Sequence, residues 1–114
     1  MVYSAVDEQL LEELNAVKEV IHKYNSLSPA DAAGRLEILK SLLGSIGDDD
    51  IIINQPFYCD YGKQISVGKR FFANFHFTVL DEANVTIGAG SVVTKDIPSN
   101  VVAVGNPCHV IKHL

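Results

Sequence analysis

Histidine is the residue type best suited to take up and return a proton near neutral pH, and this chain contains four histidines. His76 has a neighbour that suits such chemistry, because Asn74 stands two residues before it. On an extended strand, residues two apart point to the same face, so an amide and an imidazole could serve one site. A partly exposed strand histidine is the plainer interpretation, and residue type alone favours it. Of the others, His22 falls at the polar edge of a predicted helix, and His113 lies at a terminus expected to fray.

Composition and charge bound what else the chain can do. Its 114 residues suffice for one domain with a core, and 47% hydrophobic with 20% charged residues is ordinary for a globular protein. A formal net charge of -5 without a basic stripe argues against nucleic acid or an anionic membrane as a partner. No apolar run is long enough to cross a bilayer, and the start MVYSAVDEQLLEEL does not have the pattern of a signal peptide. We therefore expect a cytoplasmic protein.

The two cysteines are Cys59 and Cys108, and we expect both to be free thiols in a reducing compartment. Neither stands in a CxxC pair or a Cys/His cluster. No structural metal site is therefore expected.

The elements that would position these residues fall into two halves with different periods, and the first half is predicted to be helical. Apolar residues recur at steps of three and four from Leu10 to Tyr24, which predicts an amphipathic helix. Ser4 and Asp7 resemble a capping box at its start.

A second helix is predicted from its start signals. Ser28 suits the N-cap, Pro29 suits the first helical position, and Asp31 follows three residues after the cap. Gly44 and Gly47 offer residues for a left-handed stop. The two helices are expected to form a hairpin that packs on something else, since the pattern spans too few heptads for a coiled coil.

After the acidic run from Asp48 to Asp50, which we expect to be a solvated turn, the period changes to about six. The inward row, which contains one small phase shift, consists of Val67, Ala73, Val79, Val85, Ile87 and Val93. A glycine comes directly after a residue of this row at two places, Gly68 after Val67 and Gly88 after Ile87. A hexapeptide period with tight turns is typical of a parallel β-helix, whereas a two-sheet domain would show hairpin dipeptides such as Asn-Gly. The period alone does not fix the hand. We expect residues 1–50 to be a helical cap and residues 51–114 a β-helix with a C-terminal tail, in one compact unit.

Three stretches carry a resemblance to a known family. They are PFYCDYGKQISVGKRFFANFHFTVLDE from Pro56, IGAGSVVTKDIPSN from Ile87, and VGNPCHVIKHL at the end. Together with the spacing of the first helix, they resemble the maltose and galactoside O-acetyltransferases, which are hexapeptide-repeat enzymes. The resemblance implies a short left-handed parallel β-helix behind a two-helix cap, mainly β overall, assembled as a homotrimer. It also implies transfer of acetyl from acetyl-CoA to a sugar hydroxyl, with a histidine as general base and a backbone amide for the oxyanion.

The resemblance places the acceptor sugar at three positions. Asp60, in CDYG, and Asn74, in FFAN, match positions that contact the sugar, and Glu82 matches an acidic residue that orients it. Carboxylates and amides suit this task because a sugar ring presents many hydroxyl groups. Turn chemistry is the alternative for Asp60 and Asn74, since both residue types favour corners.

The resemblance also places acetyl-CoA along the last coils. Ala89, Thr94 and Lys95 match positions that line the pantetheine and adenine path. His109 and Lys112 fall where basic residues face the phosphates, although arginine would suit a phosphate better than His109. Ordinary surface charge is the alternative for Lys95 and Lys112.

One family feature is missing from the chain. The family carries its catalytic histidine in a His-Pro pair several hexads after the first VTIG, but here VTIG, ending at Gly88, leads directly into AGSVVTKD, and no His-Pro occurs. The simplest account is a lost internal segment, joined at two equivalent Ile-Gly positions, and a β-helix tolerates such losses because each coil contacts mainly its neighbours. Three hypotheses remain: an O-acetyltransferase, a non-catalytic trimeric remnant, and an acyltransferase that uses His76 as its base.

Overall fold

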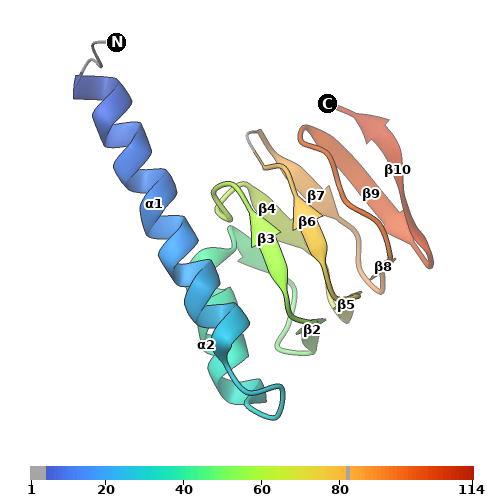
Figure 1. Cartoon of the computed structure of the whole chain (residues 1–114). Coiled ribbons are helices and arrows are strands. Elements are labelled where there is room, and N and C mark those ends of the chain that lie inside the picture. Colours follow the sequence, from blue (N-terminus) through green and yellow to red (C-terminus); the bar gives the residue numbers. More distant parts are fainter. Residues whose placement is uncertain (1–4, 82) are drawn as a thin grey trace.

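Two helices lie at one end of a stack of short strands, and the last two strands close the other end (Figure 1). The computed structural model describes residues 5–81 and 83–114. The helices are α1 (Ala5–Ser26) and α2 (Ala32–Leu42). The strands are β1 (Ser45–Ile46), β2 (Ile51–Ile53), β3 (Phe57–Cys59), β4 (Ile65–Val67), β5 (Phe71–Ala73), β6 (Phe77–Val79), β7 (Val85–Ile87), β8 (Val92–Val93), β9 (Val101–Gly105) and β10 (Cys108–His113). The predicted order of helices followed by strands is confirmed.

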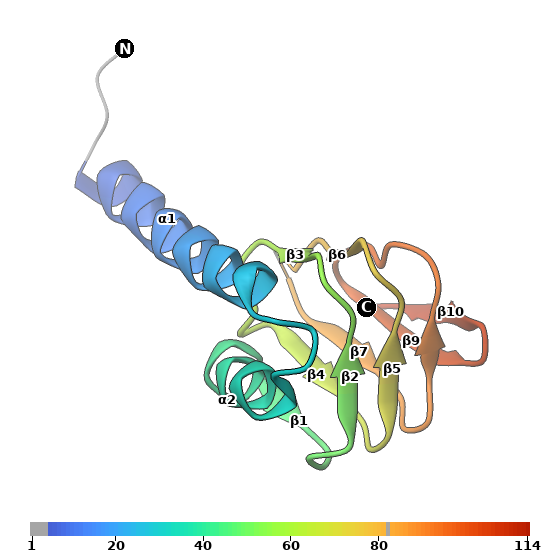
Figure 2. The ribbon, with the colours of Figure 1, turned by 60° about the horizontal axis from the view of Figure 1, so that its bottom comes forward.

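From β1 to β9, successive strands belong to different sheets, so the chain turns a corner after each of them, and β9 and β10 then form a hairpin within one sheet (Figure 2). The first sheet has the order β1-β4-β7-β9-β10, the second β2-β5-β8, and the third β3-β6. All pairs are parallel except β9 with β10. In the second sheet Ile53 pairs with Ala73, and Ala73 pairs with Val93, so one coil takes 20 residues. This is the three-sided coil of a hexapeptide-repeat β-helix.

The inward row predicted from the period is buried throughout, and its six members are at most 5% exposed. The phase shift between Val85 and Ile87 has a simple structural cause. Five residues, 80–84, connect β6 to β7, and five residues, 60–64, connect β3 to β4 one coil earlier. The shift therefore marks a longer corner that the first two coils share, whereas only residues 98–100 lie between Ile97 and Val101 at the equivalent corner of the last coil.

A column of glycines holds the corners between the first and second sheets. A Cβ atom on Gly68 would lie 2.3 Å from the backbone nitrogen of Ala89, and one on Gly47 would lie 2.4 Å from that of Lys69. Gly88 continues the column, since its Cβ would lie 2.6 Å from the side chain of Val104. Neighbouring coils thus approach too closely here for any side chain. The proposed join at Gly88 keeps this column intact.

The second helix begins later than predicted. Asp31 is its N-cap, and the carboxylate accepts a hydrogen bond from the Gly34 N–H at 2.9 Å. Ser28 instead begins a turn, in which its carbonyl accepts from the Asp31 N–H at 2.9 Å and its hydroxyl accepts from the Ala30 N–H at 3.2 Å. The prediction of Ser28 as N-cap is therefore wrong: the two residue types cap about equally well, and the turn that begins at Ser28 brings the chain into α2 at Asp31, three residues later. The predicted box at Ser4 and Asp7 lies outside the described side chains.

The end of α2 also differs from the prediction. Leu43 is extended, with φ of -78°, and neither Gly44 nor Gly47 has a positive φ. Gly44 instead donates its N–H to Ile65 O at 2.9 Å, and its Cβ would lie 2.2 Å from the carbonyl oxygen of Lys63. Glycine is needed here for close approach of two backbones, not for a left-handed stop.

Side-chain hydrogen bonds fasten the end of α1 to the first coil. The Tyr24 hydroxyl donates to Ile53 O, and Asn25 both accepts from the Phe57 N–H at 2.9 Å and donates to Phe57 O at 3.0 Å. The Tyr24 and Phe57 rings meet edge to face, and Phe57 stacks on Phe77 in the next coil. The cap and the β-helix therefore share one core. No helix within the described residues is long and apolar enough to cross a membrane.

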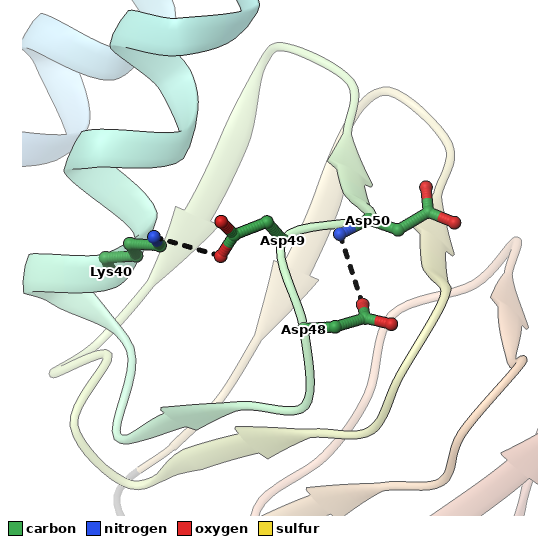
Figure 3. Close-up of polar contacts among 4 residues, drawn as sticks. All are labelled: Lys40, Asp48, Asp49 and Asp50. Carbon is green, nitrogen blue, oxygen red and sulfur yellow. Dashed lines mark hydrogen bonds and ion pairs between the residues drawn. The ribbon is translucent and has the colours of Figure 1, made fainter.

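The acidic run forms the predicted exposed turn between β1 and β2 (Figure 3). The Asp48 carboxylate accepts from the backbone N–H of Asp50 at 3.1 Å and of Arg70 at 3.2 Å. Asp49 pairs with Lys40 Nζ at 2.9 Å, and both side chains are exposed, so the pair contributes well under about 1 kcal/mol. These contacts shape a corner.

Candidate functional site

Two stacked turns bring four of the predicted site residues together. Residues 74–76 connect β5 to β6, and residues 94–96 follow β8 one coil later. The Asn74 N–H donates to Val93 O at 3.0 Å, which fixes one turn on the other. Asn74, His76, Thr94 and Lys95 line a hollow of about 20 Å³ between these turns. We call this place the Asn74 corner.

The backbone at His76 is not the strand that the sequence suggested. β5 ends at Ala73 and β6 begins at Phe77, so His76 lies in the turn, with a left-handed φ of 63°. Its N–H donates to Pro56 O at 2.8 Å, and its exposed ring meets the ring of Phe75 edge to face, with centroids 5.7 Å apart. The premise of a shared strand face is wrong, yet His76 and Asn74 still line one hollow.

Asp60 lies at a different corner, where the third sheet leads into the first. Its Oδ2 is buried and accepts no hydrogen bond from the described residues. The fully buried carboxylate of Asp81, one coil later, accepts from the N–H groups of Asp60 and Tyr61 at 2.9 Å each and of Gln64 at 3.4 Å. Burial raises the pKa of the Cys59 thiol far above its usual value, and the nearby Asp81 and Asp60 carboxylates add to the effect. Glu82 lies outside the described residues.

Sequence reasoning missed Asp81, which holds the turn that carries Asp60. The nearest signal was the repeated five-residue corner, which places Asp81 one coil after Tyr61, the neighbour of Asp60. A sequence does not show that a carboxylate points inward at the backbone of the preceding coil.

The remaining predicted residues lie at the third corner and on the final hairpin. Ala89 is exposed beside the glycine column. Ser91 fastens this corner, because its hydroxyl donates to Gly88 O at 2.7 Å and accepts from the Gly105 N–H at 3.2 Å. His109, whose Nδ1 lies 3.3 Å from Pro107 O, belongs to the same end of the molecule, and Lys112 is exposed on β10.

One chain therefore does not gather all the predicted residues into one pocket. Asp60, Asn74 and Ala89 each follow a strand of a different sheet. Within the part of the chain that the structure describes, no three His, Cys, Asp or Glu residues form a group that could hold a metal ion.

The described geometry defines a hexapeptide-repeat β-helix with a helical cap, and comparisons with known proteins identify the family. The model of the maltose acetyltransferase hexapeptide capping motif matches residues 1–47. A putative acetyltransferase of Saccharomyces cerevisiae is 33% identical, with 95% of this chain and 85% of the yeast protein covered. The galactoside O-acetyltransferase of Escherichia coli is 26% identical, with 94% and 82% covered.

Solved structures agree with these relatives. A galactoside acetyltransferase in complex with coenzyme A superposes with a TM-score of 0.65 at 25% identity, covering 97% of this chain and 85% of that one. A maltose O-acetyltransferase of Clostridium difficile gives a TM-score of 0.56 at 31% identity, covering 98% and 91%. The chain belongs to the hexapeptide-repeat acetyltransferases of the maltose and galactoside O-acetyltransferase family, and its fold is their left-handed β-helix.

The comparison with the yeast relative bears on the predicted missing segment. That alignment spans 168 positions, which exceeds the 114 residues of this chain by 54. At least that many positions of the relative therefore have no counterpart here, which is more than two coils of 20 residues. The size of the difference fits a lost internal segment, and its place at the Ile87-Gly88 join stays a prediction.

Proposed function

We propose that the protein transfers the acetyl group of acetyl-CoA to a sugar hydroxyl at the Asn74 corner. The observation that carries the proposal is the stacking of two turns there, which brings the amide of Asn74, the imidazole of His76 and the two residues that the resemblance matches to the donor path, Thr94 and Lys95, to the lining of one hollow. The coenzyme A complex of a galactoside acetyltransferase supports the donor, and the galactoside and maltose enzymes among the relatives support the acceptor.

In this mechanism the residues of the corner bind, orient and move one proton. Asn74 hydrogen-bonds the acceptor hydroxyl, and His76 takes its proton as the oxygen attacks the thioester carbonyl. The O–C bond forms, the C–S bond breaks, and His76 returns the proton to the departing sulfur. Thr94 and Lys95 hold the donor, with Lys95 offering a positive charge to a phosphate group. Acetyl-CoA supplies the activated acetyl group and leaves as the free thiol.

The hollow is far too small for both substrates, so we propose that a second copy of the chain completes the site. The outward face of the second sheet supports this. Its central residues, Ile52, Phe72 and Val92, stack in register as an apolar ladder. The matching row of the first sheet is polar at Ser45, Ser66 and Thr86 and becomes apolar only at Val102. Three copies joined at the apolar ladder would place one Asn74 corner near each junction.

In the trimer we propose that Asp60 and Glu82 contact the acceptor, and that Ala89, His109 and Lys112 line the donor path. The family resemblance supports these roles, and the buried Oδ2 of Asp60, which has no hydrogen-bond partner among the described residues, offers an acceptor for a hydroxyl. The proposed donor and the free thiols Cys59 and Cys108 fit a cytoplasmic setting.

The alternative function is binding without turnover. The number of positions missing relative to the yeast protein favours it, if the absent segment is, as we predict, the one in which the family resemblance places its histidine. The Asn74 corner would then bind its ligands but have no effective base.

One experiment separates the two functions. Protein is mixed with acetyl-CoA and a panel of pyranosides, thiol release is followed, and acetyl-CoA binding is measured in parallel by calorimetry. Turnover that His76→Ala abolishes, and that the matched control His22→Ala on α1 leaves unchanged, supports the transferase. Binding without turnover supports the alternative. No binding of acetyl-CoA contradicts both.

Lys95→Ala should weaken acetyl-CoA binding severalfold, whereas Lys69→Ala, at a corner outside the Asn74 corner, should not.

The trimer is tested by sedimentation. Phe72→Glu should dissociate it, and Thr86→Glu, at the matching place on the first sheet, should not.

A further inference from the structure

The outward face of the third sheet combines an aromatic ring with polar groups. Its strands, β3 and β6, lie side by side in Figure 1, and Tyr58 pairs in register with Thr78. Tyr58 is 47% exposed, and its neighbours Phe57 and Cys59 are more buried, so the tyrosine ring points outward. Ile97 pairs with Val79, so the preceding residue, Asp96, stands next to Thr78 one coil later. We call Tyr58, Thr78 and Asp96 the Tyr58 face.

This mixture of groups suits a sugar ring. A pyranose presents CH groups on its two faces and hydroxyl groups around its edge. An aromatic ring can therefore pack against a face while hydroxyl and carboxylate oxygens bind the edge. Leu80, which is 50% exposed and follows β6 directly, adds apolar surface. An apolar protein surface packed on the same row would instead bury the Asp96 carboxylate without a partner, which costs free energy.

The Tyr58 face joins two places that the proposed function assigns to the acceptor. At one end, Asp96 lines the hollow of the Asn74 corner together with Asn74 and His76. At the other end, Asp60 follows β3, and its buried Oδ2 has no hydrogen-bond partner among the described residues. A buried carboxylate oxygen without a donor is costly, so a ligand hydroxyl that reached it would stabilise this end.

The two ends are too far apart for a single sugar ring. The His76 N–H is bound to Pro56 O, and Asp60 lies four residues further along the same strand path. An extended chain rises about 3.3 Å per residue, so the two ends are about 13 Å apart along the strand. A ring whose hydroxyl reacts at His76 therefore cannot also contact Asp60. A second ring attached to it would lie over Tyr58, which is midway.

We propose that the acceptor is a saccharide of at least two rings, which lies along the third sheet. The reacting ring lies at the Asn74 corner beside Asp96, the next ring packs on Tyr58, and a hydroxyl of that ring binds Asp60. Tyr58 therefore selects the length of the acceptor without touching the reacting atoms. This inference rests on the proposed function, because it takes the acceptor to be a sugar.

The test compares the affinities of the full chain for saccharides of one and two rings, measured by calorimetry. The probes are methyl glucoside against maltose, and methyl galactoside against lactose. In at least one of the two series, the disaccharide should bind at least about tenfold more tightly, because its second ring removes the apolar surface of Tyr58 from water.

Variants assign this gain to the Tyr58 face. Tyr58→Ala should reduce the affinity for the disaccharide to that for the single ring, whereas Tyr58→Phe, which keeps the aromatic ring, should retain most of it. Thr78→Ala should weaken disaccharide binding severalfold, and Thr86→Ala, at the matching place on the first sheet, should not. Thermal melts check that each variant is folded.

The inference is overturned if one and two rings bind equally in both series, or if Tyr58→Phe loses as much affinity as Tyr58→Ala. Either result leaves the proposed function standing, because a single ring would still reach the Asn74 corner. If no saccharide of either length binds, this inference and the sugar acceptor of the proposed function fail together.

Discussion

Replacing Asp81 tests whether one buried carboxylate holds the corner that carries Asp60. Two backbone N–H groups donate to its Oδ1 at 2.9 Å and a third donates to Oδ2 at 3.4 Å. Hydrogen bonds to a charged acceptor contribute about 1.5–3 kcal/mol each, so losing the two short ones in Asp81→Ala should cost about 4 kcal/mol. That is a large part of the stability of a small domain.

An opposing effect reduces this figure. The Asp81 carboxylate is fully removed from water, and the Asp60 carboxylate is close enough that both act on the Cys59 thiol. Removing the charge therefore relieves desolvation and repulsion. Asp81→Asn separates the contributions, because the amide keeps one oxygen for the two short bonds but presents an N–H to Gln64. We expect Asp81→Asn to lower the free energy of unfolding by about 1.5 kcal/mol. The hydrogen bonds that the backbone N–H groups lose or weaken should outweigh the repulsion that is relieved between the two carboxylates.

The assay is urea unfolding followed by far-ultraviolet circular dichroism, with amide exchange of Asp60, Tyr61 and Gln64 as a local probe. Asp50→Ala is the matched control, because that side chain is exposed, and it should change stability by less than about 0.5 kcal/mol. In thermal melts Asp81→Ala should lower the midpoint by about 15 °C. An Asp81→Asn variant more stable than wild type, or an Asp81→Ala variant no worse than the control, would refute the reasoning.

Three further predictions concern stability and reactivity. Gly68→Ala should cost about 3 kcal/mol in urea unfolding, because its Cβ would lie 2.3 Å from backbone, whereas Gly90→Ala, facing open space at a positive φ, should cost about 1 kcal/mol; equal losses would contradict the glycine column. Burial raises the pKa of Tyr24 from 10.0 to about 12, so the native state holds that proton more tightly than the unfolded state. Stability should then fall as pH rises from 10 to 12, and the fall should shrink in Tyr24→Phe, whose unchanged pH profile would refute it. Cys59 should alkylate much more slowly at pH 8 in the native protein than in urea, because its raised pKa and its burial both suppress the thiolate; similar rates would show the corner to be open.

The fold could be predicted from the sequence because its signals are local and repeated. The six-residue period follows from one inward side chain per short strand, and the helices follow from the three-to-four spacing. The errors fell at element ends. Ser28 and Asp31 are both good N-caps by residue type, and only the path of the chain into α2 decides between them. We predicted that Gly44 adopts a left-handed conformation. Glycine is needed there instead because the backbone of Lys63 and Ile65, which are distant in the sequence, packs directly against it.

The candidate site was less predictable, for a physical reason. The period indicates which residues point inward, but corner residues are placed by contacts between coils. Asn74 and Lys95 line one hollow because one coil takes 20 residues, and the sequence alone did not connect them. Asp81 was missed because its partners are backbone groups, which every residue has.

The glycine column has a consequence for how the length of this molecule can vary. Each coil adds about 4.8 Å along the axis, the spacing of neighbouring strands, and at Gly47 and Gly68 the corner glycine leaves room for the backbone of the coil that follows. Height and cross-section are therefore independent dimensions of the architecture. A chain that differs from a relative by more than 50 positions can keep the same triangular outline, while the cap and the final hairpin seal its two ends regardless of how many coils lie between them.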